Sequence, residues 1–198
     1  EGADLVVTAD RQTGGKGTKG RSFSSSKGGV YLSKLTFYKD LPAKNAFQIM
    51  ISAAVAVCET LHAYGIKPLI KWPNDILVDN KKIAGILIEY AGRFVIVGIG
   101  INVNSNPTVD RYKTTKLDNF SEIPMNELLN RLMRNVDKWR NADFRAVRNR
   151  WTELAICLNK PVKYQGEIAE LIGINENGAL VLRRGTRYLL VYGDEIST

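Results

Sequence analysis

KIAGILIEYAGRFVIVGIGINV, at residues 82–103, is the segment that says most about the fold. It holds two apolar segments, residues 82–90 and 94–103, which the turn sequence AGR joins into a predicted β-hairpin. Two shorter apolar segments, residues 68–72 and 76–78, come before it. Successive hairpins of this kind build an antiparallel sheet, one face of which helices can cover. Because no strand–helix–strand repeat occurs, the sequence does not predict a parallel, Rossmann-type sheet.

The segments on either side complete a predicted α+β fold. Residues 5–9 are expected to form a short buried strand, and residues 30–37 a second strand. Helical spacing of apolar residues predicts three helices, at residues 42–64, 125–140 and 143–158. The first helix would begin at Pro42 and end before Gly65, since proline favours the first turn and glycine the position after the last one.

The chain changes character after the third predicted helix. Four short strand segments alternate with turns there, at residues 161–164, 167–174, 180–183 and 188–192. Closely spaced strands of this length predict a small barrel or half-barrel. Residues 104–124, by contrast, are polar and irregular, and we expect them to form a loop over a site.

The composition narrows the classes of function. The chain has 198 residues, of which 44% are hydrophobic and 24% charged, as in domains with a packed core. No apolar run reaches the ~18–20 residues that cross a bilayer, so no membrane association is expected. Two cysteines and one histidine are too few for a conventional zinc site or a Ser-His-Asp triad. A net charge of +8 is typical of proteins that bind nucleic acid, a membrane surface, a phosphorylated small molecule or an acidic protein, and it can also serve solubility alone.

The first stretch that suggests chemistry is the glycine-rich loop QTGGKGTKGR, residues 12–21. Its glycines allow the backbone to come close to a ligand. Arg11, Lys16, Lys19 and Arg21 add positive charge, and the combination suits a phosphate or a carboxylate. The spacing fits neither a Walker A loop nor a GxGxxG motif. A solvated, flexible surface loop is the alternative that these residues leave open.

The second such stretch is the KWPND segment, residues 71–75. Pro73 fixes its own φ and restricts Trp72 to extended geometry, so the backbone holds Lys71 firmly. A lysine held at a strand end can place its ammonium where charge develops in acyl or phosphoryl chemistry. The alternative is a proline turn with a packed tryptophan. Glycines within the following strands indicate a close ligand or a bulge, at Gly85, Gly98 and Gly100.

Taken in order, the motifs QTGGKGTKGR, GGVYLS, KWPND, KIAGILIE and GIGINV resemble those of the biotin–protein ligase family, over about residues 1–105. The resemblance implies a sheet packed by helices, as in class II aminoacyl-tRNA synthetases, in residues 1–158. It also implies a small SH3-like β-barrel in residues 159–198. Such a protein would be a cytoplasmic enzyme that uses ATP and Mg²⁺ to form biotinyl-5′-AMP. It would then transfer biotin to a lysine of a biotin carboxyl carrier protein or carboxylase carrier domain.

The resemblance implies roles for individual residues as well. Three cations would be catalytic: Lys71, Lys16 and Arg21. Biotin would contact Gln12, Gly15, Lys16, Lys71, Gly85 and Ile86. ATP would contact Thr18, Lys19, Arg21, Asn74, Asn102 and Glu195. No protein side chain is expected to bind a metal, and the fixed cations would offset the repulsion between the biotin carboxylate and the α-phosphate.

The chain departs from the family pattern in two places. Thr18 and Lys16 stand where the family's loop usually has arginines, and Thr18 is expected to weaken retention of the adenylate. The chain opens at residues 1–3, where the helix of the family's Ser-Thr-Asn element would be ending. That element and any N-terminal DNA-binding helices are therefore expected to be absent, so DNA is not an expected partner. An uncovered sheet edge would favour a homodimer.

Three other functions compete with this interpretation. A lipoate-type ligase shares the architecture and the adenylating chemistry, and only a substrate assay separates the two. A nucleic-acid binder would place aromatic side chains among its cations, yet residues 11–21 contain none. A non-catalytic, biotin-binding relative is the third, because the N-terminal element is expected to be missing. The basic run at residues 131–150 is most simply a solvated helical face, with an acidic carrier domain as the alternative.

Overall fold

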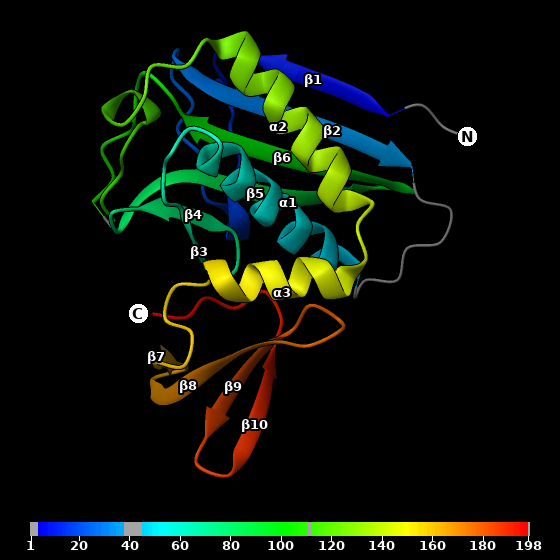
Figure 1. Cartoon of the computed structure of the whole chain (residues 1–198), viewed down its shortest axis with the longest axis vertical. Coiled ribbons are helices and arrows are strands. Elements are labelled where there is room, and N and C mark those ends of the chain that lie inside the picture. The colour runs from blue at the N-terminus through cyan, green and yellow to red at the C-terminus, as the bar shows by residue number, and fades with distance from the viewer. Residues whose placement is uncertain (1–3, 38–44, 111, 198) are drawn as a thin grey trace.

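The computed structural model describes residues 4–37, 45–110 and 112–197, and Figure 1 shows how their helices and sheets are arranged. The larger sheet has six strands in the order β1-β2-β6-β5-β4-β3. Its strands are β1 (Leu5–Ala9), β2 (Gly29–Phe37), β3 (Leu69–Lys71), β4 (Asp75–Val78), β5 (Lys81–Ala91) and β6 (Phe94–Asn102). Every pairing between them is antiparallel, so the predicted α+β fold with a largely antiparallel sheet is confirmed.

Helices cover one face of this sheet (Figure 1). They are α1 (Asn45–His62), α2 (Met125–Arg140) and α3 (Phe144–Leu154). Because α1 lies against the sheet, α2 and α3, its residues 50–58 are all buried. Alternate residues of β6 point toward the helices, and Val95, Val97, Ile99 and Ile101 are almost inaccessible to solvent. None of the helices in the described ranges is long and apolar enough to cross a membrane.

The ends of two helices differ in how well the sequence predicts them. The proposed start of the first helix, Pro42, lies outside the described residues. Its end is confirmed, since Gly65 has a φ of +76° and donates its N–H to the His62 carbonyl at 2.9 Å. The third helix ends at Leu154, earlier than residue 158, because the Ile156 N–H donates to the Ile70 carbonyl of β3 at 2.9 Å instead.

The first strand exists as predicted, but its predicted burial is wrong. All five residues of β1 are exposed, and Leu5 and Val7 each have 55% of their surface accessible. β1 is the edge strand of the sheet and pairs only with β2. The apolar sequence therefore predicted the strand correctly. It could not show whether another segment covers the strand, and no described segment does.

A group of ion pairs around the buried Lys34 fastens Asp4 and β2 to α2. The Lys34 side chain, only 3% exposed, lies 3.0 Å from Asp4 and also pairs with Asp137 of α2. Arg140 of α2 approaches Asp4 to 2.6 Å and donates to the Thr36 hydroxyl. Burial alone would raise the pKa of Asp4, but the hydrogen bonds from Lys34 and Arg140 outweigh it and lower that pKa.

The C-terminal residues form a second antiparallel sheet, in the order β10-β9-β8-β7. Its strands are β7 (Pro161–Tyr164), β8 (Glu167–Ile174), β9 (Leu180–Arg184) and β10 (Arg187–Val191). No pairing joins β7 to β10 within residues 161–191, and β7 instead bridges to the chain end through Lys163 and Ser197. The sheet is therefore open, and the predicted closed SH3-like barrel is not confirmed.

Candidate active site

A cavity of about 1150 Å³ lies on the face of the six-stranded sheet that the helices leave uncovered. Its walls come from the glycine-rich loop, the KWPND segment, β5, β6 and the C-terminal residues 195–196. The predicted site residues that line it are Gln12, Gly15, Lys16, Thr18, Arg21, Lys71, Asn74, Gly85, Ile86 and Glu195. Lys19 and Asn102 are the two that do not. Segments far apart in the sequence, including Lys16 and Lys71, thus meet at one concave surface.

The floor of the cavity is made by glycines of β5 and β6. Gly85 and Gly100 are partners in the strand register, and the Phe23 ring lies against both. A Cβ on Gly85 would come within 3.0 Å of that ring, and one on Gly100 would overlap it. Gly98 differs, because its Cβ would meet only Leu87 at 3.5 Å, an ordinary contact. The sequence signalled the glycines, whereas Phe23, the aromatic side chain that needs them, was missed.

Ile86 and Asn74 border the cavity without offering free side chains to it. The Ile86 side chain is 2% exposed and belongs to the helix-side core, since it alternates with Gly85 along β5. Asn74 is bound to the same residue, because its backbone carbonyl accepts from the Ile86 N–H at 3.0 Å. Its side-chain amide also donates to the Ile86 carbonyl, at 2.8 Å. These bonds fasten the KWPND turn to β5.

The glycine-rich loop is an ordered hairpin-like structure in the described chain. Isolated β-bridges join Gln12 to Ser25 and Lys16 to Ser22. The Ser25 hydroxyl donates to the Gln12 side-chain oxygen at 2.7 Å, which fixes that amide at the cavity wall. Gly15 is required sterically, since a Cβ there would overlap the Phe23 carbonyl. Internal pairing of this kind argues against the alternative of a merely flexible surface loop.

Two of the predicted cations differ in how firmly they are held. Lys71 ends β3, is partly buried and lines the cavity, as the proline-braced segment predicted. The Trp72–Pro73 peptide bond that follows it is cis. Lys16 is 73% exposed and reaches across to Glu89 of β5, with 3.3 Å between the Lys16 Nζ and a carboxylate oxygen. Lys16 therefore remains free to exchange this partner for a ligand.

Lys82 is a further lysine that lines the cavity, and the sequence did not predict it as a site residue. Its side chain is only 14% exposed, and its Nζ lies 2.6 Å from Asp75 of the KWPND segment. The ammonium also lies over two aromatic rings, 5.7 Å from the centroid of Phe23 and 5.1 Å from that of Tyr112. Lys82 opens the KIAGILIE motif, but its contacts with Asp75, Phe23 and Tyr112 arise only in the fold.

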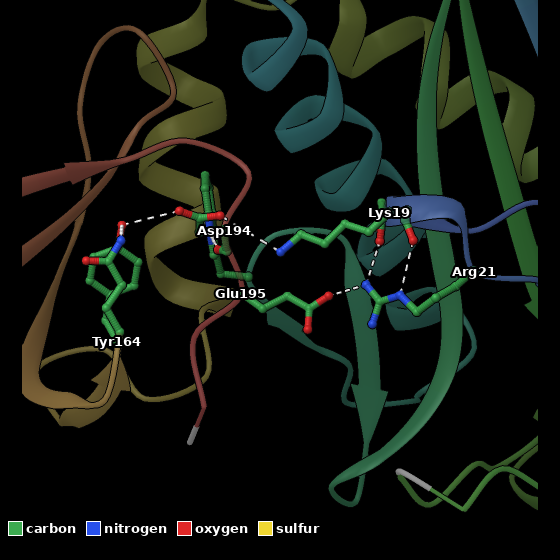
Figure 2. Close-up of polar contacts among 8 residues, drawn as sticks. Lys19, Arg21, Tyr164, Asp194 and Glu195 are labelled. Carbon is green, nitrogen blue, oxygen red and sulfur yellow. Dashed lines mark hydrogen bonds and ion pairs between the residues drawn. The ribbon is translucent and has the colours of Figure 1, made fainter.

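The C-terminal segment reaches the glycine-rich loop, as Figure 2 shows. Arg21 forms an ion pair with Glu195 and is also held by Thr18, whose carbonyl accepts from Arg21 Nε at 3.1 Å. Lys19 lies 3.9 Å from Asp194. The hydrogen bond from Arg21 holds the pKa of the Glu195 carboxyl below its ordinary value. Lys19, although outside the cavity lining, thus belongs to the same charged group.

Trp72 is a packing residue that contacts both α1 and the C-terminal segment. It is 2% exposed and stacks on Phe47 of α1, with 6.2 Å between the ring centroids. Its indole N–H donates to the Asp194 carbonyl at 2.9 Å. The packed-tryptophan interpretation of KWPND therefore holds for Trp72 together with the cavity position of Lys71.

Asn102 lies at the end of β6 and stabilises the following loop. It is 5% exposed, and its side-chain amide donates to the Thr115 carbonyl at 2.9 Å. Loop residues 113–115 also pair with Lys82, through backbone bonds of 2.9 Å to its N–H and carbonyl. The predicted loop over the site is thus confirmed in position, since Val109, Tyr112 and Lys113 line the cavity.

Comparison with known proteins identifies the family. The family model described as the biotin/lipoate A/B protein ligase family matches residues 2–106, more than half of the chain. The chain belongs to this family. It is 32% identical over 219 residues to the biotin–[acetyl-CoA-carboxylase] ligase of Mycobacterium tuberculosis, and the match covers 98% of the chain and 80% of that ligase.

Other relatives of the family agree over different lengths. The bifunctional ligase/repressor BirA of Bacillus subtilis is 46% identical over 109 residues, or 52% of the chain. The chain spans only about a third of that protein, 33% of its length. A solved structure of the biotin protein ligase from Aquifex aeolicus, in complex with biotin and ATP, matches with a TM-score of 0.80 and 28% identity. It covers 97% of this chain and 87% of the Aquifex chain.

Proposed function

We propose that this protein is an ATP-dependent biotin–protein ligase, which forms biotinyl-5′-AMP and transfers biotin to a lysine of a carboxylase carrier domain. The observation that carries the proposal is the convergence of Lys16, Lys71 and Lys82 on one cavity with a glycine floor. Two reactants that are both anionic need such a concentration of fixed positive charge. Residues 1–158 would be the catalytic core, and residues 159–198 a C-terminal domain that closes one side of the cavity.

In the first reaction, a biotin carboxylate oxygen attacks the α-phosphorus of ATP, and pyrophosphate leaves. Lys71 and Lys82 would stabilise the negative charge on the transferring phosphoryl group, and Arg21 would hold the leaving phosphates. Biotin would lie along the Gln12–Gly15 wall, beside the Phe23 ring that packs on Gly85. Positioning of both substrates in one cavity supplies the remaining rate enhancement.

ATP would occupy the end of the cavity nearest Arg21. Thr18 and Lys19 would lie beside its phosphates with Arg21, while Asn74 supports the pocket through β5. We do not assign Asn102 to the nucleotide, because its amide is already bound to Thr115. The described residues contain no cluster of three or more metal-binding side chains, so Mg²⁺ would be held largely by the phosphates. When bound, it would neutralise phosphate charge.

In the second reaction, the deprotonated amine of a carrier lysine attacks the acyl carbon of the mixed anhydride. An amide bond forms and AMP leaves. The carrier lysine must enter the cavity, because the mixed anhydride would lie there. The basic residues 131–150 lie on α2 and α3, on the other side of the sheet (Figure 1). The structure therefore favours a solvated face for that basic run over a docking site for the carrier.

A lipoate-type activity is the second candidate, because the matching family model covers both biotin and lipoate ligases. The experiment that separates them measures pyrophosphate release with ATP and either biotin or lipoate as the acid. We expect turnover with biotin, and transfer of labelled biotin to a carrier domain. Turnover with lipoate alone would refute the biotin assignment. Binding of biotin and ATP without release of pyrophosphate would identify a non-catalytic relative instead.

The exposed edge of β1 supports a homodimer as a further part of the proposal. Among the described residues β1 is an edge strand, and its exposed Leu5, Val6 and Val7 make it a suitable surface for pairing with a second copy. Light scattering after size-exclusion chromatography would measure the mass of the particle. We expect Val7→Lys to convert a dimer to a monomer, and an unchanged mass would exclude this edge as the interface.

A further inference from the structure

The side chains of Asp194 and Glu195, which we term the acidic latch, lie between the C-terminal sheet and the glycine-rich loop (Figure 2). Glu195 forms an ion pair with Arg21, and Asp194 lies 3.9 Å from Lys19. The other Asp194 carboxylate oxygen accepts from the Tyr164 hydroxyl at 3.3 Å. The latch thus joins the loop to β7 through side chains alone.

The latch neutralises the charge that a phosphate ligand would need. Arg21 and Lys19 pair with it directly, and the charge of Lys71 also helps to lower the pKa of Glu195. Two carboxylates against three cations leave one net positive charge. A polyphosphate brought to Arg21 would meet the Glu195 carboxylate at close range, and two neighbouring anions repel each other strongly where solvent is partly excluded.

The same contacts are easily exchanged. The paired side chains are 38–54% exposed, so each ion pair contributes little to folding stability. Arg21 keeps a second anchor at Thr18, through its Nε and Nη2 atoms, and would stay in place without Glu195. The backbone at residue 194 is also held separately, by the bond from Trp72. The carboxylates can therefore swing away while the loop and the segment remain positioned.

We propose that the acidic latch is an internal competitor for the nucleotide phosphates, so that ATP binds only by displacing the carboxylates of Asp194 and Glu195 from the loop. This inference rests on the proposed function, since it takes Arg21 to be the phosphate-binding cation. The latch would keep weakly charged anions out of an empty site. By thermodynamic linkage, bound ATP then weakens the ion pairs of the latch by the same factor by which those ion pairs weaken ATP binding.

The test compares full-length Glu195→Gln and Asp194→Asn/Glu195→Gln proteins with the unmodified chain by calorimetric titration. Two probes are used, MgATP and inorganic triphosphate. We expect the dissociation constant of both probes to fall about fivefold in Glu195→Gln, the most that a half-exposed ion pair is worth, and further in the double variant. Glu170→Gln is the matched control, because Glu170 pairs with Arg183 within the C-terminal sheet and does not contact the loop.

The outcomes separate this inference from the proposed function. Weaker or unchanged binding of both probes in Glu195→Gln would overturn the latch and make Glu195 a residue that positions Arg21. A fivefold gain in Glu170→Gln as well would also overturn it, since general charge removal would then explain the effect. If the unmodified chain forms no biotinyl-AMP, the ligase assignment fails, yet the triphosphate titrations still decide whether the carboxylates compete with phosphates.

Discussion

Two groups of ion pairs connect distant parts of this chain, and they differ mainly in the exposure of the central cation. On the helix face of the sheet, Lys34 is 3% exposed and lies between Asp4 and Asp137. On the cavity face, the Arg21 and Glu195 side chains are 38% and 47% exposed. In each group a cation of the N-terminal half pairs with an acid more than a hundred residues away, Lys34 with Asp137 and Arg21 with Glu195. Lys34 also pairs with Asp4, near the start of the chain.

This difference suggests that the ion pairs on the helix face stabilise the fold, whereas those on the cavity face can exchange their partners for a ligand. Removing one member of a buried pair leaves a charge without a partner in a medium of low dielectric constant, which is strongly unfavourable. Removing one member of an exposed pair leaves a charge that water solvates at once. The Lys34 group should therefore matter to folding and little to ligands, while the exposed cavity cations Lys16 and Arg21 should matter to ligands and little to folding.

The largest expected effect is on catalysis at the cavity face. Lys71→Ala and Lys82→Ala should each lower the rate of biotinyl-AMP formation by about 10²–10³-fold, as loss of one fixed group that stabilises the transition state does. Pyrophosphate release measures that rate, and thermal unfolding followed by circular dichroism checks the fold. Lys67→Ala removes the same charge from an exposed position nearby and should keep full activity. Full activity in both cavity variants would contradict the proposed site.

The next effect should appear on the helix face. Lys34→Met should lower the free energy of unfolding by about 3 kcal/mol, the lower part of the range for a broken buried pair, because Asp137 stays partly solvated. Urea denaturation measures the loss. The activity per folded molecule should not change, which is the opposite result to that of the cavity lysines. Lys81→Met, at an exposed position of β5, serves as the control. A loss no larger than that of the control would remove the basis for the comparison.

A smaller effect would show how far the cavity face also contributes to packing. Gly100→Ala places a methyl group against the Phe23 ring, and overpacking of this kind costs roughly 1–2 kcal/mol. Gly98→Ala is the matched control, because its new methyl group would meet only Leu87 at 3.5 Å. Differential scanning calorimetry of the two variants gives the comparison. Equal melting temperatures would show that the Phe23 ring moves aside freely.

The sequence predicts the elements of the main sheet well because its patterns are local. The hairpin at β5 and β6 follows from two apolar segments and a short turn, and α2 follows from helical spacing. Burial of β1 was wrong, since burial depends on what lies over a strand rather than on the strand itself. Closure of the C-terminal barrel was likewise not confirmed, because it depends on pairing between its first and last strands.

The candidate site was predictable to the extent that single residues signal chemistry. Lysines and glycines in unusual motifs marked Lys16, Lys71 and Gly85, and all of these line the cavity. Strand alternation turns Ile86 toward the core, which a motif alone does not reveal. Lys82 and Phe23 were missed because their importance comes from neighbours, Asp75 and Gly100, that only the fold brings to them.

The smallest effect is a dependence of stability on pH, and it compares the two ion-pair groups directly. Asp4 has a lowered pKa in the folded protein, so the folded state holds its proton less tightly than the unfolded state, in which the pKa is about 3.9. The stabilisation from Asp4 is complete above that unfolded value and is lost as the pH falls through the lower folded pKa. Glu195 shifts in the same direction but is more exposed, so its contribution should be weaker.

Urea unfolding of the unmodified chain, Asp4→Asn and Glu195→Gln between about pH 6 and pH 3 measures both contributions. The stability difference between the unmodified chain and Asp4→Asn should be constant at the upper end and shrink toward the lower end. The corresponding difference for Glu195→Gln should be smaller throughout. If the Glu195 difference were the larger one, exposure would not be what separates the two groups, and the acidic latch would be a structural joint rather than an exchangeable one.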